Sequence, residues 1–191
     1  MTEVPARVER VLDQVLSSVA PPQPFQVGEF CRRLGEQRGH PIELMPLSQV
    51  LGGRVAPFDG LLVSAYDADY VFYDDTTSAL HQQNTVLHEI GHLVLEHRSI
   101  GDSGQPRLPM LRLLFPHFDE ARRTELLGKA LCRAGFQDLQ EREAESFATQ
   151  FSARLLDAAG GRVLGRKAKR LPPHEAQVID RLAHGLGPTQ Q

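Results

Sequence analysis

Residues 87–95 read LHEIGHLVL, and this stretch decides how the chain is interpreted. Three of its residues, His88, Glu89 and His92, form the pattern H-E-x-x-H. Apolar residues recur around them at three- and four-residue spacing, which predicts a helix from about Leu80 to His97. Side chains four apart share one face of a helix, so both imidazoles could reach the same metal ion.

Glu89 has a different position on this helix. At about 100° per residue it lies beside both histidines but turned away from the face that would ligate the metal. A carboxylate placed in this way can act on a water molecule held by the metal. The pattern therefore predicts zinc bound by His88 and His92, with Glu89 as the general base. The apolar neighbours strengthen the interpretation, since these polar groups would be costly to bury without a purpose.

A catalytic zinc takes three protein ligands and leaves one position to water, so a third ligand is needed. A third histidine of the extended motif would stand at position 98, which is Arg98. His97 falls on the apolar side of the helix and is predicted to be a buried, hydrogen-bonded histidine, and His81 is predicted to lie on the surface. The third ligand should therefore be a carboxylate from a later helix.

The best candidate is the helix predicted over residues 139–158. Its apolar stripe leaves Glu141 and Glu145 together on one flank and turns Glu143 elsewhere, where a solvated surface position is expected. The residues alone leave Glu141 or Glu145 as the third ligand. Gly91 should allow a neighbouring strand or loop to approach the histidine helix closely.

The remainder of the chain predicts an α+β fold, mostly helical with a small antiparallel sheet. Helices are expected over residues 5–19, 25–38 and 119–134, and strands within residues 41–78. Asp74, Asp75 and Thr76 offer capping side chains before the histidine helix. We expect a single domain over residues 1–191, with N-terminal helices over about 3–38, the sheet and histidine helix over about 41–98, and C-terminal helices over about 110–186.

Composition excludes several classes of function. The net charge of −3 gives no general attraction to nucleic acid, and no apolar run is long enough to cross a bilayer. The N-terminus lacks the apolar core of a signal peptide, and the two cysteines, Cys31 and Cys132, do not suggest a disulfide framework. We expect a cytoplasmic protein without membrane or direct nucleic-acid contact. The basic cluster within residues 162–170 is predicted to be a solvated face.

His-Glu-Ile-Gly-His on a helix, followed by Glu-x-x-Ala-x-x-Phe-Ala, resembles the ImmA/IrrE-type metallopeptidases over residues 61–156. The resemblance implies a zincin-like core in which a second helix supplies the glutamate ligand. It assigns Glu141 as that ligand and makes Glu145 a candidate for orienting a histidine ligand. It also implies that the substrate is a helix-turn-helix transcriptional repressor, whose cleavage induces stress-response or mobile-element genes.

Two functions follow from these expectations. The first is a zinc-dependent endopeptidase that acts on an extended protein segment added to the edge of the sheet. The alternative is a non-catalytic metal-binding regulatory module that holds a repressor or a toxin-system partner, although such a module has no need for Glu89. The donor to the oxyanion stays unassigned, and Tyr66, Tyr70, Tyr73 and His174 are the residues considered for it.

Overall fold

The computed structural model describes residues 3–52, 58–97, 112–115, 121, 131–132 and 138–168. The chain divides into two compact units, Met1–Ser152 and Ala153–Gln191. The first unit holds the sheet, the helix with the H-E-x-x-H pattern and the residues of the predicted site. The described part of the second unit continues the last helix as far as Ala168. The fold is α+β and mostly helical, as predicted.

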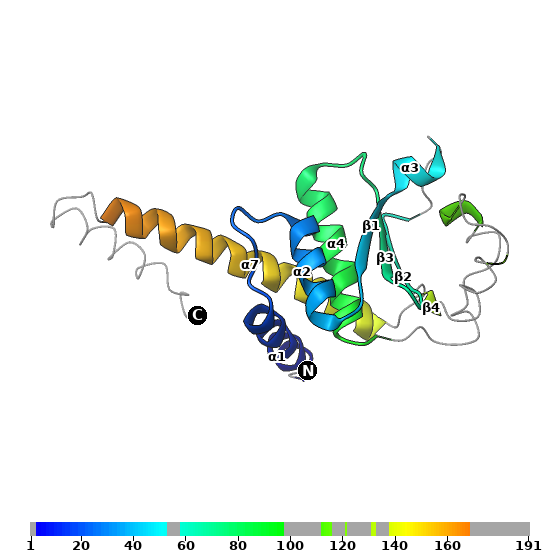
Figure 1. Ribbon diagram of the computed structural model, residues 1–191. Helices are drawn as coiled ribbons and strands as arrows, with labels where there is room; N and C mark the ends of the chain where they lie inside the picture. The colour runs from blue at the N-terminus through cyan, green and yellow to red at the C-terminus, as the bar shows by residue number, and fades with distance from the viewer. Residues whose placement is uncertain are drawn as a thin grey trace. The chain divides into compact units, whose positions relative to one another are not determined.

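Five helices and four strands have defined bounds in the described residues (Figure 1). The helices are α1 (Glu3–Ser18), α2 (Val27–Arg38), α3 (Leu47–Leu51), α4 (Ala79–Val94) and α7 (Asp138–Ala168). The strands are β1 (Ile42–Pro46), β2 (Gly60–Ser64), β3 (Asp69–Tyr73) and β4 (Leu131–Cys132). The predicted helices over 5–19, 25–38, 80–97 and 139–158 correspond to α1, α2, α4 and α7. The helix predicted over 119–134 lies largely outside the described residues, but the prediction is wrong at Leu131 and Cys132, which form β4 because they pair with β2. Helix α3 was not predicted.

The strands form one sheet in the order β1-β3-β2-β4, in which β2 is antiparallel to both β3 and β4. β1 pairs with β3 in the parallel direction, so the prediction of a purely antiparallel sheet is wrong. Apolar residues in short runs indicate strands but not their direction. The short turn between β2 and β3 makes that pair antiparallel, whereas the longer connection between β1 and β2 contains α3.

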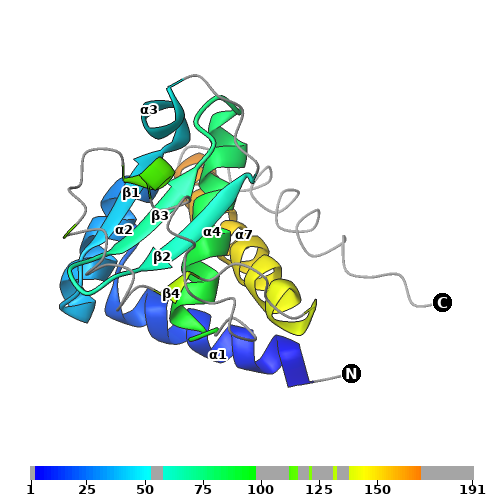
Figure 2. The same ribbon diagram turned by 90° about the vertical axis from the view of Figure 1, so that its right-hand side faces the viewer.

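Helices α2 and α4 cover one face of the sheet (Figures 1 and 2). Leu62 of β2 and Val71 of β3 are completely buried. Behind α4, an aromatic cluster joins α2 to α7, where Phe30 and Phe151 meet edge to face with ring centroids 4.9 Å apart. Full burial of a side chain of this size contributes about 1.5 to 3 kcal/mol. Packing of α7 in the first unit therefore depends on these rings.

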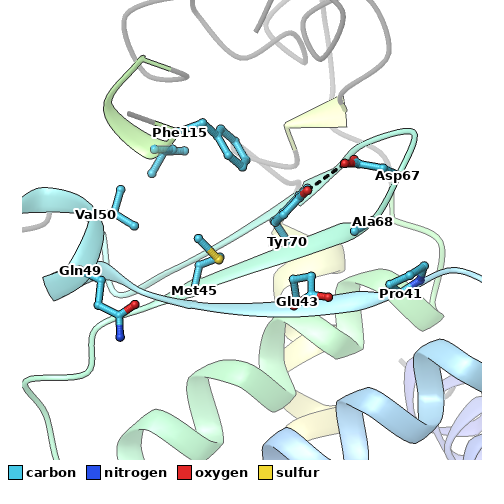
Figure 3. A pocket seen from close by; sticks show the side chains of 10 residues that line it. Pro41, Glu43, Met45, Gln49, Val50, Asp67, Ala68, Tyr70 and Phe115 are labelled. Atoms are coloured by element: carbon cyan, nitrogen blue, oxygen red, sulfur yellow. Dashed lines mark hydrogen bonds between the residues drawn. The ribbon is translucent and has the colours of Figure 1, made fainter. Parts of the chain in front are cut away.

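The opposite face of the sheet packs against residues 113–115 and borders a cavity of about 460 Å³ (Figure 3). Tyr70 and Met45 point into this side, and Phe115 lies above them, with α4 on the far side of the sheet. The Tyr70 hydroxyl donates to Oδ2 of Asp67 at 3.1 Å. This cavity is therefore separated from the histidines by the sheet itself.

Within the described residues, none of the helices has the length and apolar character required to cross a membrane.

Candidate metal centre

Helix α4 begins differently from the prediction. Ser78 is its N-cap, and the Ser78 side chain accepts the backbone N–H of His81 at 3.3 Å. Asp74 instead accepts the N–H of Thr76 in the preceding turn, and Asp75 accepts the N–H of Ser48. The three predicted capping residues thus lie one turn too early. His81 is exposed at this end of the helix, as predicted.

His88, His92 and Glu141 form a group that could hold a metal ion. The Nε2 atoms of the two histidines lie 3.0 Å apart. Oε2 of Glu141 lies 3.3 Å from Nε2 of His88 and 3.7 Å from Nε2 of His92. α4 thus supplies two imidazole nitrogens and α7 one carboxylate oxygen, and all three atoms face a common centre.

Glu145 lies one helical turn beyond Glu141 and approaches the same histidine from another side. Its Oε2 is 3.6 Å from Nδ1 of His88, the ring nitrogen that does not face the group. Its side chain is 63% exposed. At this distance Glu145 does not hydrogen-bond to His88, and it lies outside the group formed by His88, His92 and Glu141.

Glu89 is buried between α4 and β2. A Cβ atom built on Gly60 would lie 2.7 Å from Oε1 of Glu89, so the carboxylate occupies space that only a glycine leaves. Burial raises the pKa of Glu89 to about 8, and the charge of Glu141 adds to the rise. A hydrogen bond from the backbone N–H of Leu62 acts in the opposite direction and lowers the pKa.

The outer edge of β2 lies beside this carboxylate. Two backbone hydrogen bonds show which way β2 faces. Asp74 N donates to Asp59 O, and Ala65 N donates to Ala68 O, so Asp59 and Ala65 direct their backbone groups toward the β3 side. Backbone groups alternate in direction along an antiparallel strand, so Gly60 and Leu62 direct theirs away from β3. β4 pairs with β2 only at Val63 and Ser64. Among the described strands, none pairs with the outer edge over Gly60–Leu62, where the N–H of Leu62 donates to Glu89.

Gly91 brings the two ligand helices together. A Cβ atom there would lie 3.1 Å from Cα and 3.2 Å from the carbonyl oxygen of Ala144 on α7. The close approach predicted for Gly91 is therefore made by a helix and not by a strand or loop. It sets the distance at which Glu141, on the turn of α7 before Ala144, faces the histidines of α4.

We expect Gly91→Ala to weaken metal binding by pushing the two helices apart. Gly28→Ala is the matched control, because a Cβ atom there would meet only Leu44 Cδ1, at 3.9 Å. Both changes replace glycine by a better helix former, so their difference in unfolding free energy isolates the overpacking at Gly91, about 1 to 3 kcal/mol. Urea unfolding and competition with a zinc chelator measure the two effects. Equal behaviour of the two variants would contradict the role given to Gly91.

His97 is buried and hydrogen-bonded, as predicted. Its Nδ1 lies 2.9 Å from Nδ1 of His92, and its Nε2 lies 2.9 Å from Oε2 of Glu143. Glu143 is itself buried, so the prediction of a solvated surface position for it is wrong. The helical wheel compared Glu143 only with the apolar stripe of its own helix, and the polar partners come from other parts of the chain.

The turn that ends α4 directs His97 toward His92. Glu96 N donates to Leu93 O, and His97 N donates to His92 O, which is the bonding pattern of a Schellman motif. Glu96 is the left-handed residue of this motif, with φ of 55°. A non-glycine residue in this conformation costs about 1 to 2 kcal/mol. That cost is the sign of a backbone held in place by its surroundings.

An open hollow of about 520 Å³ reaches the candidate centre from the side of α7. His88, Glu141 and Glu145 line it together with polar residues further along the helix, Arg142, Ser146, Thr149 and Gln150. His92 is only 1% exposed, while the Glu141 side chain is 48% exposed. The group is therefore buried on one side and accessible on the other.

The three tyrosines considered as hydrogen-bond donors to the oxyanion lie in different parts of the fold. Tyr70 faces the cavity beyond the sheet, and Tyr66 is exposed after the end of β2. Tyr73 is paired with Gly60 and so shares its face of the sheet, the face toward α4. Burial raises the pKa of Tyr73, and the charge of Asp75 contributes. His174 and the side chains of the basic cluster over residues 162–170 lie outside the described residues.

No family model matches this chain, and neither a curated protein nor a solved structure matches it at a significant level.

Proposed function

We propose that the protein is a zinc-dependent endopeptidase that binds its metal through His88, His92 and Glu141. The observation that carries the proposal is the convergence of two imidazole nitrogens and one carboxylate oxygen beside a buried Glu89. Zinc ligands at about 2.0 to 2.2 Å in tetrahedral geometry lie about 3.3 to 3.6 Å from one another. The separations here, 3.0, 3.3 and 3.7 Å, lie on both sides of that range, so small shifts of the side chains would bring the three atoms to a common zinc ion.

The accessibility of the group supports a catalytic centre over a structural one. Structural zinc sites are closed by four protein ligands, whereas catalytic sites keep a position for water or substrate. Within the described residues the group has three ligand atoms, and the hollow along α7 leads to it. A bound zinc ion supplies Lewis acidity, which polarises a peptide carbonyl and makes water more acidic.

Glu89 would move the proton in this reaction. Its carboxylate would accept a proton from the attacking water and then transfer it to the nitrogen of the leaving amine. The burial that raises its pKa also disfavours its ionised form, but a divalent cation nearby would favour that form again. The Leu62 N–H and the space above Gly60 hold the carboxylate in position.

The outer edge of β2 would hold the substrate. An extended segment could bond to the backbone of Gly60 and to the carbonyl oxygen of Leu62, next to the carboxylate that accepts the Leu62 N–H. Recognition through the backbone requires a substrate segment that is unfolded or mobile. The resemblance to the ImmA/IrrE-type metallopeptidases supports a helix-turn-helix repressor as the substrate, and the induction of stress-response or mobile-element genes as the consequence.

The direct test incubates the zinc-loaded protein with helix-turn-helix repressors, beginning with any that is encoded beside it. We expect defined fragments by mass spectrometry, and their loss when a chelator removes the zinc. A cut between two residues of a mobile segment would agree with binding at the β2 edge. If the partner stays intact while zinc occupancy is confirmed and a complex forms, the regulatory-module alternative would replace the peptidase.

A further inference from the structure

A chain of polar contacts leads from the candidate centre to the N-terminal helix. Nδ1 of His92 faces Nδ1 of His97, and Nε2 of His97 faces Oε2 of Glu143. The same Glu143 oxygen accepts Nη1 of Arg7, on α1, at 2.7 Å. Four residues from three helices and the turn after α4 are thereby joined in one line. None of the three partners beyond His92 belongs to the proposed ligand group.

Ligation would fix the direction of every hydrogen bond in this line. If His92 holds the metal through Nε2, its Nδ1 carries the proton and donates to Nδ1 of His97. Nε2 of His97 must then be the protonated nitrogen of that ring, and it donates to Glu143. Glu143 acts only as an acceptor, which agrees with its second bond from Arg7. Each of the three contacts therefore joins one donor to one acceptor.

Arg7 also has a second contact that ties it to α4. Its Nη2 donates at 2.7 Å to the carbonyl oxygen of Leu95, the C-cap residue of that helix. Carbonyls at a helix C-terminus lack partners within the helix, and a cation is favourable there. The guanidinium thus bridges the end of α4 and the carboxylate of α7, and it compensates the negative charge of Glu143, whose side chain is only 4% exposed.

We propose that Arg7, Glu143 and His97 are positioning residues that make the metal affinity of His92 depend on docking of α1. The inference rests on the proposed metal centre but not on peptidase activity. The donation from His92 to His97 would hold the His92 ring at the angle that metal binding needs. Arg7, whose side chain is 47% exposed at the outer end of the line, transmits the position of α1 to that ring.

The test measures zinc dissociation constants of the full chain by competition with a chelator. We expect His97→Phe, which keeps the ring but loses both nitrogens, to weaken binding about 10 to 100-fold, as is typical for partners of metal-bound histidines. Arg7→Met should cost less, and Arg10→Met, at another exposed arginine of α1, should cost nothing. His97→Gln should recover part of the affinity, because its amide can both accept from His92 and donate to Glu143.

Two further measurements distinguish a positioning role from a loss of folding. Circular dichroism should show the same helix content for all variants, and Arg7→Met tests the inference even if a change at the buried His97 unfolds the chain. Because Arg7 and Glu143 act through one line, the combination of Arg7→Met with Glu143→Gln should cost less affinity than the two single changes together. If folded Arg7 and His97 variants bind zinc as tightly as the parent, the positioning role is wrong, but the metal centre is not affected. A parent chain that binds no zinc would overturn the metal centre as well.

Discussion

Replacing Glu89 by glutamine should lower the rate of hydrolysis by about 10² to 10⁴-fold while the protein keeps its zinc. Glutamine has nearly the same shape, so it fits the space above Gly60 and can still accept the N–H of Leu62. It cannot accept a proton from water. Because burial disfavours the charge of Glu89, the neutral side chain should not reduce the stability of the metal-free protein.

The measurement compares zinc content and cleavage rate in the parent and in Glu89→Gln, with thermal unfolding as the check on folding. The same variant separates the two functions in cells, where a reporter follows release of the repressed gene. A peptidase predicts no induction by the zinc-loaded variant. Full induction would mean that binding is sufficient, and the regulatory-module alternative would then be correct.

Glu141→Gln should weaken zinc binding far more than Glu145→Gln. Glu141 places its Oε2 at 3.3 and 3.7 Å from the two ligand nitrogens, so its replacement removes a charged ligand. Oε2 of Glu145 lies 3.6 Å from Nδ1 of His88, and loss of a residue that orients a ligand typically costs about 10 to 100-fold in metal affinity. The two changes are chemically identical and lie one helical turn apart, which makes each the control for the other.

Chelator competition gives the two dissociation constants directly. The opposite order, with Glu145→Gln the more damaging, would transfer the role of third ligand to Glu145. Equal and small losses would indicate that neither acid is a ligand, and the site would then need a donor from residues outside the described part of the chain.

The part of the site that depends on local spacing could be predicted from the sequence. His88 and His92 are four residues apart on a helix, so their convergence follows from helix geometry alone. The choice between Glu141 and Glu145 does not, because both lie on the same flank of α7. It depends on the register of α7 against α4, which is set by the contact of Gly91 with Ala144.

Long-range polar partners could not be predicted in the same way. Glu143 is buried because Arg7 and His97 reach it from other helices and turns, and no periodicity within α7 indicates partners so far away in the chain. The parallel pairing of β1 with β3 has a similar cause, since it depends on the route of the chain between strands. The burial of His97 was predicted from a helix that continues to residue 97, but α4 ends at Val94, so the turn after the helix places His97 and not the helical wheel.

The contact between His97 and His92 depends on where helix α4 ends. His97 reaches His92 only because the helix ends at Val94 and Glu96 reverses the backbone. One additional residue in the last turn would rotate everything beyond it by about 100° around the helix axis. The five-residue interval from His92 to His97 is therefore as informative as the four-residue interval inside H-E-x-x-H. Together with two acids separated by one residue on a later helix, it defines a longer signature by which chains with the same arrangement can be recognised.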